Sequence, residues 1–163
     1  MKKPFSFKEQ FAKGKAAELA FLRKHPGLIP LSGRKGEYFI RLTMEKVELK
    51  TDFYRLSESP NCFLEMAMEY GGVRRKSGVH QAVEHNCNFL VYWFVEDDVE
   101  FWFNPVTLRD FVLEWERLRP DTERPVKNVS DQPPHEPYYA HGFPIPRAAL
   151  SRIVLPSPLG GNI

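Results

Sequence analysis

The sequence is poor in cysteine and in long apolar runs. Its two cysteines, Cys62 and Cys87, are too few for the disulfide framework of a small secreted domain. The longest apolar run, Phe89 to Val95, is much shorter than the roughly 20 residues that cross a bilayer. The first residues form an amphipathic stretch and not the apolar core of a signal peptide. We therefore expect a cytoplasmic protein with reduced thiols and no membrane partner.

The sequence also lacks a strong charge of either sign. A formal net charge of +2 is too small to indicate a nucleic-acid partner by itself. Two clusters of basic residues could contact phosphates, namely Arg34 and Lys35, and Arg74, Arg75 and Lys76. Gln81 lies on the helix predicted to follow the second cluster. A solvated loop and a helix-surface glutamine explain these residues at least as well when each is taken alone.

The motifs of several enzyme classes are missing. No nucleophile elbow, phosphate-binding loop or dinucleotide-binding fingerprint occurs in the sequence. His80 and His85, together with the two cysteines, lack the close paired spacing of a zinc site. We interpret both histidines as structural residues.

Length and hydrophobic pattern predict one mixed α/β domain. A chain of 163 residues with 42% hydrophobic residues suits a single domain with its own core. Helices are predicted at 7–24, at 79–85 and from Pro105 onward, with Asn104 as the N-cap of the last. Strands are predicted at 36–42, 47–54, 62–70, 89–95 and 99–103, and a basic loop at 74–78. We expect these strands to form a central mixed sheet flanked by helices.

The C-terminal part of the chain differs in composition. From residue 119 onward lie 9 of the 14 prolines, and 122–137 is predicted to be loop. Two short apolar stretches, 143–146 and 153–155, are expected to dock back on the domain. The sequence indicates no internal repeat and no second domain.

The chain contains a single Glu-x-Lys motif, at Glu48 and Lys50. On a strand these two side chains point to the same face, together with Asp52, while the residues between them can pack into a core. Glu18 lies on the apolar stripe of the first helix, where an unpaired carboxylate is costly. A helix acid that faces the sheet and strand acids that face the helix would converge on one point.

Converging carboxylates indicate magnesium chemistry. Magnesium prefers oxygen ligands, keeps several waters and binds one or two carboxylates together with substrate phosphate oxygens. Such an ion polarises a phosphoryl group and lowers the pKa of a bound water. A nearby ammonium, here that of Lys50, can orient the attacking water or stabilise the charged transition state.

The order of a helix acid, a strand acid and a Glu-x-Lys on the next strand resembles the PD-(D/E)XK nuclease superfamily. Three segments are similar to a phage-type branch of it: Phe11-Ala12-Lys13-Gly14, Glu48-Leu49-Lys50-Thr51-Asp52 and Asn61-Cys62-Phe63-Leu64-Glu65. The resemblance covers residues 7–95, with a weaker match at 142–146. It implies a restriction-endonuclease-like fold and the hydrolysis of DNA with Mg²⁺, for which Mn²⁺ would substitute.

The resemblance also implies roles for particular residues. Glu37 and Glu48 would hold the metal, Glu18 would add to or orient that shell, and Lys50 would assist the water. Further candidate ligands are Asp52 and Glu65, and Gln81 lies on the helix where the superfamily often carries a polar residue that helps to position substrate or water. Glu37 departs from the family pattern, which usually has Asp at this position, and its longer side chain alters the metal geometry.

Two rival hypotheses stand beside the nuclease. One is a nucleic-acid-binding protein on the same fold that has lost activity, which Glu37 suggests. The other is an interaction protein that uses the proline-rich segment. Many members of the superfamily act as dimers, including resolvases of branched DNA, so the resemblance is compatible with a homodimer, with a branched substrate and with the cytoplasm of a bacterium or a phage-infected host.

Overall fold

The chain folds around two β-sheets, which a computed structural model describes for residues 7–129 and 136–160. The first sheet has five strands in the order β1-β2-β3-β6-β7. Their bounds are Leu28–Pro30, Glu37–Ile40, Lys46–Asp52, Phe89–Phe94 and Val99–Phe103. β3 and β6 run parallel, and the other neighbours are antiparallel. The expectation of a mixed five-stranded sheet flanked by helices is confirmed, although β1 is too short for the sequence pattern to predict it.

A second sheet is absent from the sequence-based expectation. It has four antiparallel strands in the order β5-β4-β9-β8, with the bounds Val73–Lys76, Asn61–Tyr70, Pro137–Pro146 and Arg124–Val129. The placement of 62–70 in the central sheet is therefore wrong. β4 instead pairs along most of its length with β9, because the C-terminal segment returns to cover its edge.

Two segments that the sequence predicts as loops form strands. The basic segment after Tyr70 turns through Gly71 and Gly72, which have φ of 54° and 79°, and continues as β5. Two glycines with positive φ are typical of a two-residue hairpin turn. The proline-rich segment contains β8, an edge strand that tolerates Pro125 because an edge residue has no partner to lose on its outer side. The rest of that predicted loop, 130–135, lies outside the described residues.

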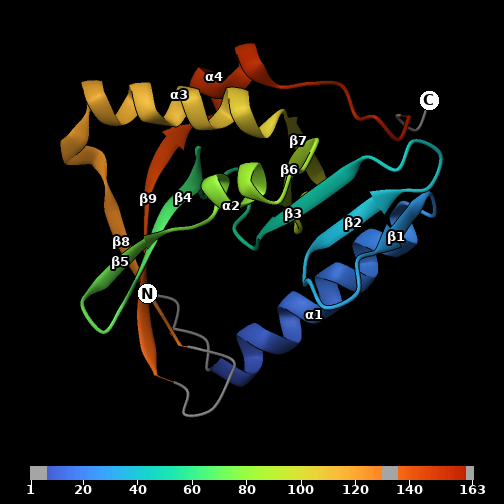
Figure 1. The fold of residues 1–163 in the computed structure, drawn as a ribbon, viewed down its shortest axis with the longest axis horizontal. Coiled ribbons are helices and arrows are strands. Elements are labelled where there is room, and N and C mark those ends of the chain that lie inside the picture. Colours follow the sequence, from blue (N-terminus) through green and yellow to red (C-terminus); the bar gives the residue numbers. More distant parts are fainter. Residues whose placement is uncertain (1–6, 130–135, 161–163) are drawn as a thin grey trace.

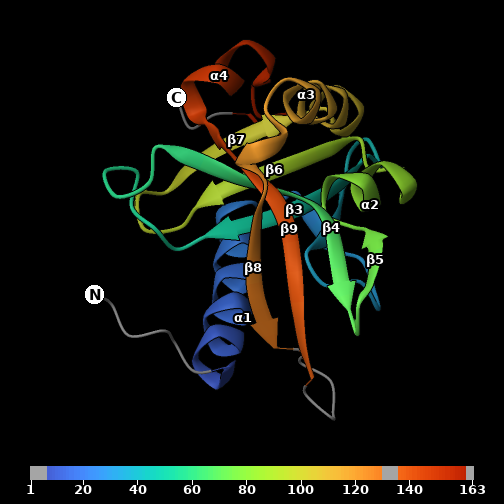
Figure 2. The same cartoon turned by 90° about the vertical axis from the view of Figure 1, so that its left-hand side faces the viewer.

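The first sheet is covered on both faces. Helix α1 (Phe7–Lys24) packs Ala17 and Phe21 against one face, in a core that includes Val47 and Leu49 of β3. β6 contributes alternate residues to the two cores, which confirms that its apolar run is a central strand. Figures 1 and 2 both place α1 on one side of the molecule and α3 on the other.

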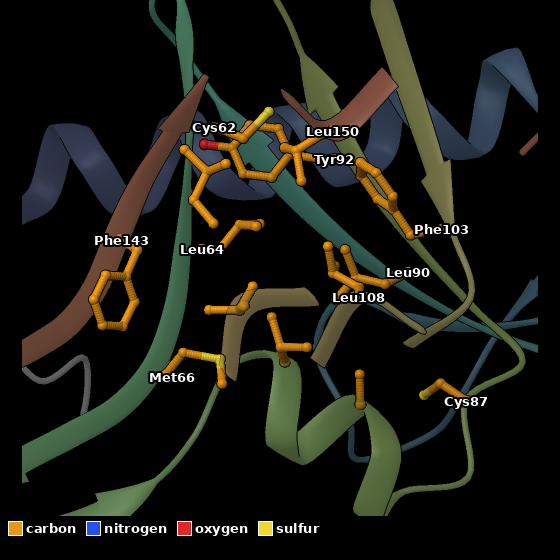
Figure 3. Packing of buried hydrophobic residues seen from close by; sticks show 14 of the residues in the cluster. Cys62, Leu64, Met66, Cys87, Leu90, Tyr92, Phe103, Leu108, Phe143 and Leu150 are labelled. Carbon is orange, nitrogen blue, oxygen red and sulfur yellow. The ribbon is translucent and has the colours of Figure 1, made fainter. Parts of the chain in front are cut away.

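The opposite face of the first sheet packs against the second sheet and three helices. These helices are α2 (Val79–Glu84), α3 (Pro105–Leu118) and α4 (Arg147–Leu150). Figure 3 shows residues of both sheets meeting in this core, with Leu64 from β4, Phe143 from β9, and Leu90 and Tyr92 from β6. The core therefore fixes the second sheet relative to the first.

Local signals set the remaining ends. Asn104 caps α3, since its side chain accepts a hydrogen bond from the Thr107 N–H at 3.0 Å, as predicted. The C-terminal segment docks as expected, because Leu155 N donates to Trp102 O at 2.7 Å. Turns of 3₁₀ type occupy Pro120–Thr122 and Ser151–Ile153. No helix within 7–129 and 136–160 is long and apolar enough to cross a membrane.

A charged network ties the end of α1 to the first sheet. Glu100 on β7 accepts hydrogen bonds from His25 at 2.7 Å and from the Trp102 indole at 2.9 Å, and Lys24 lies 2.7 Å from it. Burial by itself would raise the pKa of Glu100, but the hydrogen bonds from His25, Lys24 and Trp102 outweigh burial and lower the pKa to about 2. Only 9% of this side chain is exposed, so the network is weakly screened by water.

We predict that Glu100→Gln destabilises the protein in a pH-dependent way. The pKa of Glu100 is lower in the folded state than its ordinary value of 4.5, so its contribution is fully present above that pH and is lost as the pH falls toward 2. The variant should lose about 2 kcal/mol of unfolding free energy at pH 7 and much less at pH 3, in urea titrations. Glu114→Gln, on the exposed face of α3, is the control. A deficit that is equal at both pH values would contradict this role.

Candidate metal centre

Two buried glutamates face each other across neighbouring strands. Glu37 on β2 and Glu48 on β3 are directly opposed in the antiparallel register, and each residue is only 5% exposed. Like charges in this arrangement repel, and burial weakens the screening by water. Such a pair needs compensating positive charge at the same place.

The hydrophobic pattern of both strands fixes this pairing. Tyr38 of β2 and its register partner Val47 of β3 belong to the core beneath α1, so the neighbours Glu37 and Glu48 point to the opposite face. Gly36, with φ of 72°, lets the chain approach β3 closely, and a Cβ atom there would lie 3.2 Å from Leu49 O. The backbone thus brings the first acid against the Glu-x-Lys strand.

The two acids have different partners. Lys50 Nζ lies 2.5 Å from Glu48 Oε1, as the shared strand face predicts. Glu37 contacts His85 Nδ1 at 2.5 Å and Arg34 Nη1 at 3.5 Å. The second oxygen of Glu48, Oε2, is buried and has no hydrogen-bond partner among the described residues. A buried acceptor without a partner is unfavourable, so this oxygen marks a place for a ligand.

His85 is the third member of the cluster, beside Glu37 and Glu48. Its interpretation from the sequence as a structural histidine does not predict this position. One ligand atom each from Glu37, Glu48 and His85 lies within 4.8 Å of the others. A metal ion with bonds of about 2.2 Å brings its ligands to within about 4.4 Å of one another, so small side-chain movements would suffice. Sequence spacing gives no sign of this, because the fold alone brings His85 beside Glu37.

Backbone contacts hold His85 at this place. It is the C-cap of α2, where its N–H donates to Gln81 O at 2.8 Å. Lys46 Nζ donates to the His85 carbonyl at 2.9 Å. Lys46 and Asn88 exchange two further hydrogen bonds, each of 2.9 Å, between the turn after α2 and the start of β3. Main-chain hydrogen bonds therefore fix the backbone of His85, and the contact with Glu37 holds its ring.

Glu18 does not join the cluster. Its helix packs on the face of β3 that carries Val47 and Leu49, whereas Glu48 and Lys50 point to the other face. The expected convergence of a helix acid and the strand acids is therefore wrong. Burial raises the pKa of Glu18, and this rise is opposed by the charges of Lys35 and Lys15. Glu18 lines a separate cavity of about 390 Å³ that Glu37 also borders.

Asp52 shares the face of Glu48 and Lys50, as predicted, but serves the fold. Its two oxygens accept hydrogen bonds from the Tyr92 hydroxyl and from Tyr54 N, each at 2.8 Å. Burial foremost, and then Asp52, raise the pKa of Tyr92 well above its ordinary value. Both carboxylate oxygens of Asp52 are thus engaged, and the residue lies outside the cluster of candidate ligands.

Glu65 lies across a cavity from the Glu-x-Lys strand. The cavity has a volume of about 300 Å³ and is bordered by Lys50 and Thr51 of β3 and by Glu65 of β4. Ser77, which is buried, donates a hydrogen bond of 2.5 Å to Glu65. A bulge at Glu65 interrupts the β4–β9 register, as is common next to functional sites. Glu65 is not part of the glutamate–histidine cluster.

Two glycines allow the chain to close around Glu65. A Cβ atom at Gly78 would lie 2.2 Å from Glu65 O, and one at Gly142 would lie 2.5 Å from Leu64 O. Any side chain at either position would push β4 away from its neighbours. The place of Glu65 at the cavity is therefore set by the backbone on both sides of its strand.

The predicted phosphate contacts have separate locations. Arg34 and Lys35 line the cavity beside Glu18, and Lys35 also lies over the Phe11 ring. Arg74 forms a two-pronged ion pair with Glu123, so its charge is already matched. The remaining predicted contacts are Arg75 and Lys76, both exposed on the edge strand β5, and Gln81, half-buried on α2.

Cys87 lies close to the acids and stays a thiol. Burial, followed by the charges of Glu48 and Glu37, raises its pKa to about 12. Cys62 is buried and free as well. Neither cysteine offers the thiolate that a soft metal site uses.

Comparison of this chain with protein-family models, with curated proteins and with solved structures gives no match. The resemblance to a nuclease superfamily consequently stands on the sequence motif alone. The site consists of a buried pair of carboxylates, one ammonium and one imidazole, and of these groups the Lys50 ammonium belongs to a residue that borders the cavity beside Glu65.

Proposed function

We propose that this protein is a nuclease that hydrolyses DNA phosphodiester bonds with a divalent metal ion, Mg²⁺ or Mn²⁺. Glu37 and Glu48 would hold the ion, and Lys50 would act on the reacting groups. The proposal extends to a restriction-endonuclease-like fold, in which a Glu-x-Lys strand carries the site. A homodimer, branched DNA as the preferred substrate and a bacterial or phage-infected cytoplasm stay predictions from the same resemblance.

The unpartnered Oε2 of Glu48 carries the proposal. Glu48 is buried directly opposite a second glutamate, and Lys50 satisfies only its other oxygen. A protein rarely leaves a buried carboxylate oxygen without a partner unless a ligand supplies one. A divalent cation would be coordinated by the free oxygen, and its charge would offset the repulsion between the two acids.

The residues divide the chemistry between them. When bound, a divalent ion polarises a phosphoryl oxygen and makes a water more acidic. Glu37 and Glu48 would fix the position of the ion on the sheet. The Lys50 side chain is 39% exposed, so its ammonium can reach a substrate phosphate and offset the charge that develops on it. The cavity beyond Lys50 offers room for the groups flanking that phosphate.

Support for a nucleic-acid substrate comes from β5. All four of its residues are exposed, and they include Arg75 and Lys76. β5 leads through Ser77 and Gly78 into α2, whose last turn places His85 at the acids. Cations on a strand joined so directly to the site are well placed to hold a polyanion.

A binding protein without activity is the second candidate. Glu37 already contacts His85 and Arg34, and Glu48 contacts Lys50, so the protein itself supplies part of the compensating charge. This protein would bind DNA in a salt-dependent way and would not cleave it with any metal.

We predict that Glu48→Gln and Lys50→Met each reduce DNA cleavage by about 100-fold or more, because the first removes a proposed metal ligand and the second removes the ammonium that offsets charge in the transition state. The assay compares supercoiled, linear, single-stranded and branched DNA with Mg²⁺, with Mn²⁺ and with a chelator. Glu48→Gln should fold normally, since it removes one of two facing negative charges.

Glu96→Gln and Lys127→Met are the matched controls, because they make the same chemical changes at exposed positions. Full activity in either site variant would contradict the proposed site. A wild-type protein that binds DNA but cleaves none of the four substrates would favour the binding protein instead.

We further predict that Arg75→Ala combined with Lys76→Ala weakens binding to every DNA sequence alike and lowers the salt dependence by about two phosphate contacts. Fluorescence anisotropy at several salt concentrations measures both quantities. Arg23→Ala with Arg117→Ala removes the same charge from exposed sites on other elements and should change affinity far less. Equal losses of DNA affinity in the two double variants would show that the cations of β5 only protect an exposed sheet edge and do not bind DNA.

A further inference from the structure

We propose that the metal centre is a mixed nitrogen–oxygen site in which His85 is a ligand, and that it therefore selects Mn²⁺ or a similar first-row transition ion over Mg²⁺. The inference deepens the proposed function, on whose metal site it rests. It adds a residue and an ion class that the Glu-x-Lys motif does not indicate.

The convergence of three donors is the first argument. Glu37, Glu48 and His85 each present one ligand atom within 4.8 Å of the other two, and both glutamates are buried. The free Oε2 of Glu48 lies in the same group of residues. Three protein ligands leave coordination positions for water and for a phosphate oxygen, as catalytic metal sites require.

The anchoring of His85 is the second argument. Its main-chain N–H and carbonyl are bound by Gln81 and Lys46, at 2.8 and 2.9 Å, so the imidazole sits at the end of a fixed turn. Its side chain keeps 32% exposure, which leaves part of the ring accessible to solvent and to an entering ion. The contact of Nδ1 with Glu37 places the ring directly beside one of the two carboxylates.

The identity of the donors decides the class of ion. Mg²⁺ prefers oxygen ligands and keeps most of its water, so an imidazole contributes little to its binding. Imidazole nitrogen suits first-row transition ions, and affinity rises along that series from Mn²⁺ to Cu²⁺ and falls again at Zn²⁺. Two carboxylates with one imidazole therefore favour Mn²⁺, or Fe²⁺ and Zn²⁺, over Mg²⁺ at equal concentration.

Neighbouring charges limit the affinity without removing the preference. Lys50 and Arg34 each contact one of the two glutamates, and Lys46 reaches the His85 carbonyl. These cations weaken the binding of any divalent ion to a similar degree. The difference in affinity between Mn²⁺ and Mg²⁺ therefore depends on the imidazole, which a substitution of His85 removes.

Electron paramagnetic resonance of Mn²⁺ tests the inference directly. The full-length protein, first stripped with a chelator, is titrated with Mn²⁺, and the loss of the free-ion signal gives the affinity. Pulsed measurements on the bound ion then report whether a ¹⁴N nucleus is coupled to it. We expect one bound Mn²⁺ per chain, a ¹⁴N coupling, and displacement only by Mg²⁺ in large excess.

Variants separate the contribution of each ligand. His85→Ala should lower Mn²⁺ affinity by about 10-fold or more and abolish the ¹⁴N coupling, while Mg²⁺ affinity changes little. His85→Gln retains a polar side chain and checks that loss of the imidazole, rather than local unfolding, is responsible. His80→Ala, on the same helix, is the matched control and should behave as wild type.

The outcomes distinguish this inference from the nuclease proposal. Bound Mn²⁺ without ¹⁴N coupling, or His85→Ala with unchanged Mn²⁺ affinity, would overturn the histidine ligand even if Glu48-dependent cleavage is observed. A histidine-bound Mn²⁺ in a protein that cleaves no DNA would overturn the nuclease and leave the metal site in place. Absence of any bound Mn²⁺ would overturn the inference.

Discussion

Two carboxylates held opposite each other in a buried strand pair set the constraint on which this site depends. Glu37 and Glu48 cannot move apart, because the residues next to them are fixed in the core beneath α1. Their repulsion is relieved only in part by Lys50, Arg34 and His85, and one oxygen of Glu48 stays unsatisfied. The fold thus maintains an arrangement that is unfavourable without an added positive charge.

The two-core architecture separates structural and functional roles. One face of the first sheet packs against α1. The other face carries Glu37 and Glu48, and it also packs into the core shared with the second sheet. Glu65 and its cavity lie between β3 of the first sheet and β4 of the second, and the close approach of Gly78 and Gly142 fixes the backbone around Glu65. The proposed site is therefore assembled by rigid elements, which favours the positioning that phosphoryl transfer requires.

Strand alternation and helix signals were sufficient to predict much of this structure. α1 and α3 were predicted, and the shared face of Glu48 and Lys50 follows from a period of two residues. No local pattern predicts the second sheet, because β9 pairs with β4, a strand far away in the sequence. The Gly71–Gly72 turn, by contrast, is a local hairpin signal that could have predicted β5.

The candidate site was predictable to the same limited extent. The alternation of side chains along one strand predicts that Glu48 and Lys50 share a face, but it does not indicate which face α1 covers, and Glu18 therefore lies on the opposite side from the one expected. His85 was not predictable, since only tertiary contacts, such as the hydrogen bond from Lys46 on β3 to the His85 carbonyl, bring it to the acids. Long-range contacts of this kind depend on the whole fold and leave no spacing in the sequence.

The most direct test of the account is X-ray diffraction from crystals soaked in Mn²⁺, recorded at a wavelength where the ion scatters anomalously. We predict one strong anomalous peak between Glu37 and Glu48, within bonding distance of the Glu48 oxygen that has no hydrogen-bond partner among the residues that the structure describes. A fully soaked crystal with no peak there, or with the peak at another cluster of acids, would contradict the central claim.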